Sequence, residues 1–294
     1  MEITSSDIKK LIDGSGYPFE LRVTQKFFDR GYNVKPSYRF LDESREKDVE
    51  LDLVASKNEY VETVSGKKAY TMLRIGIECK DNSLPFVLFG SETRRAPQPE
   101  YIDDDTFYCQ ISTSRDKGFL NRFSIPIFGN NDSYGEVKKF HHQFNDLCRY
   151  YSVSHVEKKG KESNPFLKLH QSDSLAYATK KLGAFIGEET KFVSGQDGKN
   201  TGKLLEEAMQ APIILITFTM LAHTVPHFRY CNGHNSPEKS NFSSVFMNRS
   251  YDGKHLSYVV DFVSENALDE AINKIESSFN KMIEKTVPYV ISDH

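Results

Sequence analysis

Two strand-like segments joined by a short reversal constrain the fold of this chain most. In residues 47–56 (KDVELDLVAS), valine and leucine alternate with aspartate and glutamate, which is the period of a β-strand with one apolar face. Residues 69–80 (AYTMLRIGIECK) form a second run, with two isoleucines on one face and Glu78 and Lys80 on the other. A Ser-Gly step lies between the runs, so together they predict an antiparallel hairpin.

The remaining segments predict further helices and strands around this hairpin. Helical spacing covers residues 19–30, 141–151, 172–187 and 266–285. Strand-like runs cover residues 32–41, 86–89, 107–112, 212–218 and 256–263. This order predicts an α/β protein with a mixed sheet flanked by helices. We expect a single domain over residues 1–294, with residues 87–165 as a large insertion in it.

Composition excludes several classes of protein. Hydrophobic residues make up 38% of the chain and charged residues 27%, which is too apolar for a disordered protein and too polar for a membrane protein. The longest apolar run, residues 211–220, is half of the roughly 20 residues that a membrane span needs. Four scattered cysteines without a CxxC motif and the lack of a secretory signal predict a cytoplasmic protein with reduced thiols.

The far end of the hairpin brings acidic and basic side chains together. If the reversal centres on the Ser-Gly step, Asp52 lies opposite Cys79 and beside Glu78. Glu78 and Lys80 are two residues apart and share a face. Two neighbouring carboxylates repel, and a divalent metal removes that penalty while it supplies a Lewis acid. Lys80 can orient or deprotonate a water, so the cluster predicts metal-assisted hydrolysis of a phosphodiester.

The same residues resemble the motif of the PD-(D/E)xK nuclease superfamily. The tripeptide Glu78-Cys79-Lys80 resembles the E-x-K half of the motif, and Asp52 resembles its isolated first acid. Glu20 lies on the first of the helices assigned above, where members tend to carry a glutamate. The string RGYNV after this helix is also typical of these proteins. The resemblance is closest over residues 16–90.

The resemblance implies a restriction-endonuclease-like fold, which is a mixed β-sheet core flanked by helices, and cleavage of DNA or sometimes RNA. It implies that Asp52 and Glu78 bind Mg²⁺, for which Mn²⁺ can substitute, with the carbonyl of Cys79 as an additional ligand. It also implies that Lys80 activates the attacking water and that Glu20 supports the metal or its water shell. A homodimer would suit two single-strand cuts across a duplex.

Other interpretations of the same residues stay open. Asp48 lies one repeat before Asp52 on the same face and is the alternative first acid. The charges near Glu78 are also compatible with a salt bridge across a solvated sheet. A protein of the same fold that binds a nucleic acid or a protein partner without cutting would keep the pattern.

A second group of candidate ligands and several phosphate-binding candidates lie elsewhere in the chain. Four potential zinc ligands follow one another in the segment HTVPHFRYCNGH: His223, His227, Cys231 and His234. Because a proline interrupts this segment and the spacing matches no zinc module, we favour ordinary histidines in a loop. The basic residues that could contact phosphates are Lys67, Lys68, Arg94, Arg95, Lys158, Lys159 and Lys161. Tyr150 and Tyr151 either stack on bases or pack in a helix.

Overall fold

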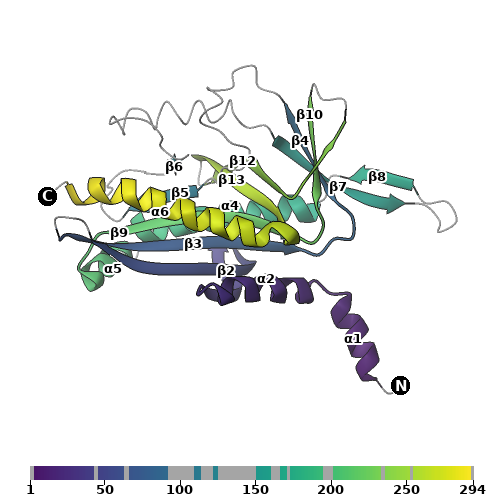
Figure 1. Cartoon of the computed structure of the whole chain (residues 1–294), viewed down its shortest axis with the longest axis horizontal. Helices are drawn as coiled ribbons and strands as arrows, with labels where there is room; N and C mark the ends of the chain where they lie inside the picture. The colour runs from purple at the N-terminus through teal and green to yellow at the C-terminus, as the bar shows by residue number, and fades with distance from the viewer. Residues whose placement is uncertain are drawn as a thin grey trace.

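The predicted hairpin forms two adjacent strands of a large mixed sheet (Figure 1). A computed structural model describes the chain over residues 3–42, 46–62, 66–91, 109–113, 122–124, 150–159, 166–170, 173–194, 201–232, 236–251 and 254–292. Strand β1 (Asn33–Asp42) pairs antiparallel with β2 (Lys47–Glu62), which pairs antiparallel with β3 (Lys68–Lys80). Strand β9 (Ile213–His223) then lies parallel to β3.

Four further strands complete this sheet on the far side of β9. Strand β13 (Lys254–Ser264) pairs parallel with the end of β9, and β12 (Phe242–Tyr251) pairs antiparallel with β13. Strand β5 (Cys109–Thr113) pairs antiparallel with the first half of β9, and β6 (Arg122–Ser124) pairs with β5. Every residue of β9 is buried, as expected for a continuous apolar run with neighbours on both edges and cover on both faces.

A second, smaller sheet joins strands from distant parts of the chain. Its order is β11-β10-β4-β7-β8, with β10 and β4 parallel and the other pairs antiparallel. The strands are β4 (Phe86–Ser91), β7 (Tyr150–Lys159), β8 (Phe166–His170), β10 (His227–Asn232) and β11 (Glu238–Ser240).

Helices cover both faces of the large sheet, so the chain is an α/β protein with mixed sheets flanked by helices, as the element order predicts. Helices α2 (Tyr17–Asp29) and α6 (Leu268–Ser292) pack on one face, in a core with Ile75 and Ile77 of β3. Helix α4 (Asp173–Ser194) packs on the opposite face. The shorter elements are α1 (Ser5–Asp13), α5 (Thr201–Met209) and the 3₁₀ turn η2 (Glu265–Ala267).

Helix α2 begins and ends where the sequence predicts. Pro18 lies in its first turn, where a missing N–H costs nothing, and Gly31 follows with a left-handed φ of 78°. Helix α1, which the sequence analysis missed, has a capping box between Thr4 and Asp7 but buries no residue, and it extends away from the body (Figure 1). None of the helices in the described ranges has the length and apolar character that a bilayer crossing requires.

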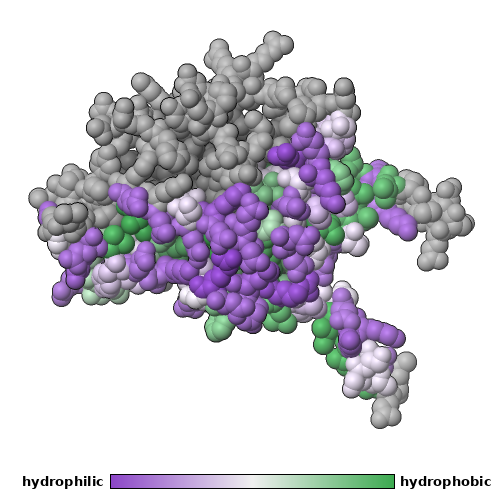
Figure 2. All heavy atoms as spheres, viewed as in Figure 1, coloured by the Kyte–Doolittle hydropathy of each residue, from purple (hydrophilic) through white to green (hydrophobic). Residues whose placement is uncertain are grey.

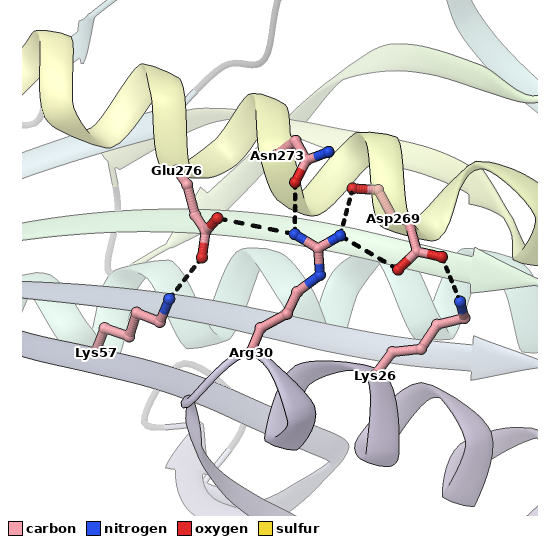
Figure 3. Close-up of polar contacts among 6 residues, drawn as sticks. All are labelled: Lys26, Arg30, Lys57, Asp269, Asn273 and Glu276. Atoms are coloured by element: carbon pink, nitrogen blue, oxygen red, sulfur yellow. Dashed lines mark hydrogen bonds and ion pairs between the residues drawn. The ribbon is translucent and has the colours of Figure 1, made fainter.

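Polar contacts join the first and last helices of the core. The guanidinium of Arg30, just after α2, contacts Asn273, Asp269 and Glu276 of α6 (Figure 3). Lys26 and Lys57 contact the same acids, at 2.6 Å from Asp269 and 2.5 Å from Glu276 (Figure 3). Figure 2 accordingly shows hydrophilic side chains gathered over α2 and α6.

One predicted helix is wrong in the part that the structure describes. Residues 141–149 lie outside the described ranges, but Tyr150 and Tyr151 are on strand β7 instead of in a helix. Lys158 and Lys159, two of the candidate phosphate contacts, end the same strand. Pairing of β7 with β4, which is remote in the sequence, and with β8, which is the next strand, overrides the local helical spacing.

Candidate active site at the splayed end of β2 and β3

The regular alternation of side chains between the two faces of the sheet is interrupted at one point in strands β1 and β2. Leu51 packs in the core under α4, whereas Leu53 packs in the core under α2 and α6, on the other face of the sheet. Residues two apart in a regular strand share a face, so the strand is twisted out of alternation at Asp52. On the partner strand, Ser37 interrupts the ladder at the matching position and has a left-handed φ of 48°. This paired kink lifts the start of β2 away from β3.

The carboxylate of Asp52 lies where β2 and β3 separate. The regular ladder between the two strands ends at the pair of Leu53 with Ile77. Beyond it, Oδ2 of Asp52 accepts a hydrogen bond of 2.6 Å from the backbone N–H of Cys79, a donor that the separated strand no longer pairs. The predicted register was wrong by one residue. If the observed ladder is extended by one pair beyond Leu53 and Ile77, Asp52 lies opposite Glu78 and on the same face, whereas the prediction put it opposite Cys79.

Helix α4 approaches β3 closely because β3 has a glycine at the contact. A Cβ built on Gly76 would lie 2.5 Å from the ring of Phe185, so the ring occupies the space of a side chain. Phe185 and Lys181 are four residues apart on one helix face, and Gly76 and Glu78 are two apart on one strand face. The packing of Phe185 against Gly76 therefore places Lys181 over Glu78. The ammonium group of Lys181 contacts Oε1 of the Glu78 carboxylate.

The same spacing, four residues on α4 for every two on β3, brings a further pair of side chains together one turn farther along the helix. Nη2 of Arg74 on β3 is 2.9 Å from Oε1 of Glu189, and both side chains are almost fully buried. The guanidinium also lies over the ring of Tyr38, at 5.6 Å from its centroid. Burial raises the pKa of Glu189, and the charge of Arg74 acts against the rise. This pair and the Phe185 contact fix the position of α4, and hence of Lys181, along β3.

Glu78 is a fully buried acid between two lysines. Nζ of Lys80 is 3.5 Å from Oε2 of Glu78, while Lys181 contacts Oε1 and donates a 2.8 Å hydrogen bond to the carbonyl of Glu50. Burial, followed by the charge of Asp52, raises the pKa of Glu78 to about 7, and the two lysines act against the rise. A carboxyl group with this pKa is held close to the point between its charged and neutral forms at neutral pH.

Glu20 reaches the same cluster from α2, on the other side of the sheet. Burial is the first cause that raises its pKa, and the charge of Asp52 is the second, whereas Lys80 and Lys181 act against the rise. The structure thus brings the predicted site residues together from α2, β2 and β3.

The thiol of Cys79 points into the core, and burial raises its pKa well above the ordinary value. Cys79 remains a candidate ligand only through its carbonyl.

The alternative first acid lies farther from Glu78. Asp48 is exposed and pairs with Leu41 of β1, one repeat nearer to the turn between β1 and β2. Asp52, in contrast, bonds the backbone beside Glu78. The geometry therefore favours Asp52 as the acid of the cluster.

The donor set suits a hard divalent cation that keeps some of its own ligands. Within the described residues, no group of three or more His, Cys, Asp or Glu side chains is arranged to hold a metal ion. Asp52 and Glu78 supply two carboxylates, and Mg²⁺ in proteins is commonly held by one or two carboxylates together with water and substrate phosphates. The two side chains therefore fit Mg²⁺ bound with substrate, rather than a metal enclosed by protein.

The candidate zinc ligands are engaged by the protein instead. Nδ1 of His223 contacts the carbonyl of Val225, and its Nε2 lies 3.2 Å from Nδ1 of His227. Nε2 of His227 is 2.8 Å from the hydroxyl of Ser243. Because a carbonyl can only accept, Nδ1 of His223 must donate to it. Nε2 of His223 then accepts from Nδ1 of His227, and Nε2 of His227 accepts from the hydroxyl of Ser243. Both rings are buried, and burial lowers the pKa of His223 to about 4 and that of His227 to about 2. His234 lies outside the described residues, as does the side chain of Cys231.

The predicted phosphate contacts near the hairpin turn are wrong in position. Lys67 and Lys68 lie at the turn between β2 and β3, whereas the acidic cluster lies at the other end of both strands. Ten residues of strand between Lys68 and Glu78 span about 33 Å. Lys158 and Lys159 are on β7, and Arg94, Arg95 and Lys161 lie outside the described residues.

Lys181 and Gly76 belong to the site although the sequence analysis did not name them. A glycine inside a strand signals close approach of another group, so Gly76 was detectable in principle. Lys181 had no such signal, because its role depends on α4 packing against β3 about 100 residues earlier in the chain. The same holds for Ser37, whose backbone conformation is visible only in the structure.

Comparisons with known proteins add no functional information. A scan against family models, a search of curated proteins and a search of solved structures each found no match to this chain. Function must therefore be inferred from the geometry and chemistry of the site itself.

Proposed function

We propose that this protein is a metal-dependent nuclease of the PD-(D/E)xK type that hydrolyses phosphodiester bonds in DNA. The observation that carries the proposal is the Asp52 carboxylate at the splayed end of β2 and β3, bonded to the backbone between Glu78 and Lys80. Two strands that separate around an acidic side chain lower the stability of the fold, because buried charges are left close together. The separation is useful where those charges must hold a cation.

The strand order supports the restriction-endonuclease-like fold as part of this proposal. Strands β1, β2 and β3 form an antiparallel meander, helix α4 crosses one face, and β9 returns parallel to β3. Helix α2 brings Glu20 to the opposite face. This is the mixed sheet flanked by helices that the motif implies, with both halves of the motif on neighbouring strands.

Each residue has a role in the proposal that follows from its position. Asp52 and Glu78 hold Mg²⁺, with the carbonyl of Cys79 as a further ligand, and Glu20 supports the ion or its water shell. A bound Mg²⁺ supplies positive charge for the phosphorus centre and for the leaving oxygen. Lys80, which is about one quarter exposed at the end of β3, positions the attacking water, and its positive charge stabilises the negative charge that develops during attack.

A cleavage assay tests this function. Plasmid DNA, single-stranded DNA and RNA are incubated with the protein in Mg²⁺, in Mn²⁺ and in excess chelator. We expect cleavage of DNA that requires the metal, and a decrease of at least ~100-fold for Lys80→Ala, since one preorganised donor that stabilises transition-state charge contributes about 10²–10³-fold. The matched control is Lys68→Ala, at the other end of the same strand, where the side chain is exposed. This control should cleave like the wild type.

Two results would contradict the nuclease proposal. Equal cleavage by Lys80→Ala and the wild type would remove Lys80 from the catalytic step. DNA binding without metal-dependent cleavage would favour the alternative, a binding module of the same fold. That alternative draws its support from Glu78, whose two oxygens already have lysine partners.

A further inference from the structure

The site contains a second lysine that the proposed reaction does not use. The Lys181 side chain is only 10% exposed, and its ammonium contacts Oε1 of the fully buried Glu78. Lys80 lies at 3.5 Å from the other oxygen and is 27% exposed. The contact of Lys181 is therefore the closer and the less solvated of the two. Removing one partner of a buried ion pair is strongly destabilising, because it leaves the other charge buried without a partner.

Glu78 requires positive charge in the absence of any metal. Its carboxylate has no solvent access, and the acids Asp52 and Glu20 lie in the same cluster. An isolated buried carboxylate is costly unless a cation pairs with it. A divalent ion would meet this need, and so does an ammonium group, but the two compete for the same oxygen.

We propose that Lys181 is an internal counter-ion that occupies Oε1 of Glu78 until a divalent metal displaces it. The inference rests on the metal site of the proposed function and adds to it a residue on α4. Lys181 acts through Glu78, so it is a positioning residue. Through its contact with Oε1 it holds the carboxylate in place, aimed at the metal position, before the metal arrives.

The surroundings of Lys181 keep the displaced ammonium in the site. Nζ also donates a 2.8 Å hydrogen bond to the carbonyl of Glu50, and it lies 5.7 Å from the centre of the Tyr177 ring. Neither contact involves Glu78. The seat of Phe185 on Gly76 prevents the helix from sliding along β3. A phosphodiester bound at the metal would then offer the freed ammonium a new anionic partner.

A titration with Mn²⁺ alone tests the displacement. Chelator-stripped protein is titrated under nitrogen at pH 8.5, and free Mn²⁺ is followed by electron paramagnetic resonance. We expect Lys181→Met to bind Mn²⁺ about tenfold more tightly than the wild type, since the ion no longer has to break a charge-assisted contact. Lys181→Arg, which keeps a cation at this position, should bind like the wild type.

The charge-matched control is Lys80→Met. It removes one positive charge from the same carboxylate, so it measures the general electrostatic gain. Lys181→Met must bind more tightly than Lys80→Met for the proposal to hold. Equal or weaker binding would overturn the counter-ion role while leaving the metal site intact. Lack of Mn²⁺ binding by the wild type and all variants would instead contradict the proposed function, and the displacement with it.

A second measurement follows Lys181 directly and needs no variant to fold. The wild-type protein is treated with an amine-acylating reagent with and without Mn²⁺, and the modified lysines are quantified by mass spectrometry. We expect Mn²⁺ to increase modification of Lys181 at least threefold. The neighbouring Lys180, which is exposed, should be modified equally in both samples. Unchanged modification of Lys181 in metal-saturated protein would contradict displacement.

Discussion

The carboxyl group of Glu78 binds protons differently in the folded and unfolded chain. Its pKa is about 7 in the folded protein, because of burial and then the charge of Asp52, against an ordinary value of 4.5. Between these two pH values the folded state binds more protons than the unfolded state. Raising the pH across this window therefore lowers the free energy of unfolding. The site carries a stability cost that is fully present above pH 7.

We therefore expect Glu78→Gln to change the pH dependence of stability. The stability of the variant relative to the wild type should rise by about 3 kcal/mol between pH 4.5 and pH 8, since each pKa unit corresponds to about 1.4 kcal/mol. Urea unfolding at a series of pH values measures the difference. Glu62→Gln, which removes an exposed acid on β2, is the control and should parallel the wild type. Parallel curves for Glu78→Gln would show that this carboxyl group titrates normally.

Helix α4 is the element whose position decides the charge balance of the site. It contacts β3 at three steps, and neighbouring steps are two residues apart on the strand and four residues apart on the helix. At the middle step the strand residue is Gly76, which has no side chain, so the ring of Phe185 packs directly on the backbone. The outer steps are ion pairs, Arg74 with Glu189 and Glu78 with Lys181. The apolar step sets the distance at which both ion pairs can form.

At this scale we expect Gly76→Ala to disturb both stability and the site. The added Cβ would lie 2.5 Å from the Phe185 ring, so ring or helix must shift, at a cost of about 1–3 kcal/mol in thermal or urea unfolding. The control is Gly16→Ala, where the nearest contact is an ordinary 3.6 Å. Because Gly16 is the N-cap of α2, this control should lose at most about 1 kcal/mol. Adding Phe185→Leu to Gly76→Ala should recover part of the loss, and no recovery would argue against the ring as the cause.

At the scale of the whole molecule, polar contacts join the first and last core helices. Arg30 follows α2 and is only 25% exposed, and it contacts a carbonyl and three side chains of α6 (Figure 3). Lys57 on β2 shares Glu276 with it. Because α2 also carries Glu20, these contacts connect the C-terminal helix to the position of a site residue. In contrast, α1 buries no residue and lies outside this arrangement.

We expect Arg30→Met to lower the free energy of unfolding by about 1–2 kcal/mol, because several partly buried hydrogen bonds to one cation are lost together. The comparison is Arg39→Met, which removes an arginine that is 77% exposed and forms an ion pair with Glu50. An exposed pair of this kind contributes at most about 1 kcal/mol and often nothing measurable. Urea unfolding of both variants provides the test, and equal losses would contradict the role assigned to the network.

Local periodicity was sufficient for much of the secondary structure. Alternation identified β2 and β3, the continuous apolar run identified β9, and the proline and glycine at its ends located α2. The same pattern placed Glu78 and Lys80 on one face. It failed at β7, where Tyr150 and Tyr151 lie on a strand that pairs with β4. It also misplaced the hairpin register by one residue, because the position of the turn was assumed.

The sequence by itself determined which side chains share a face within each element, since that follows from the geometry of a single helix or strand. Only the tertiary structure decided that β2 leaves β3 at Asp52, that the backbone kinks at Ser37, and that Lys181 reaches Glu78. These features depend on how elements far apart in the chain pack against one another. Packing is set by the shapes of all the contacting side chains together, and a local pattern of polar and apolar residues does not contain that information.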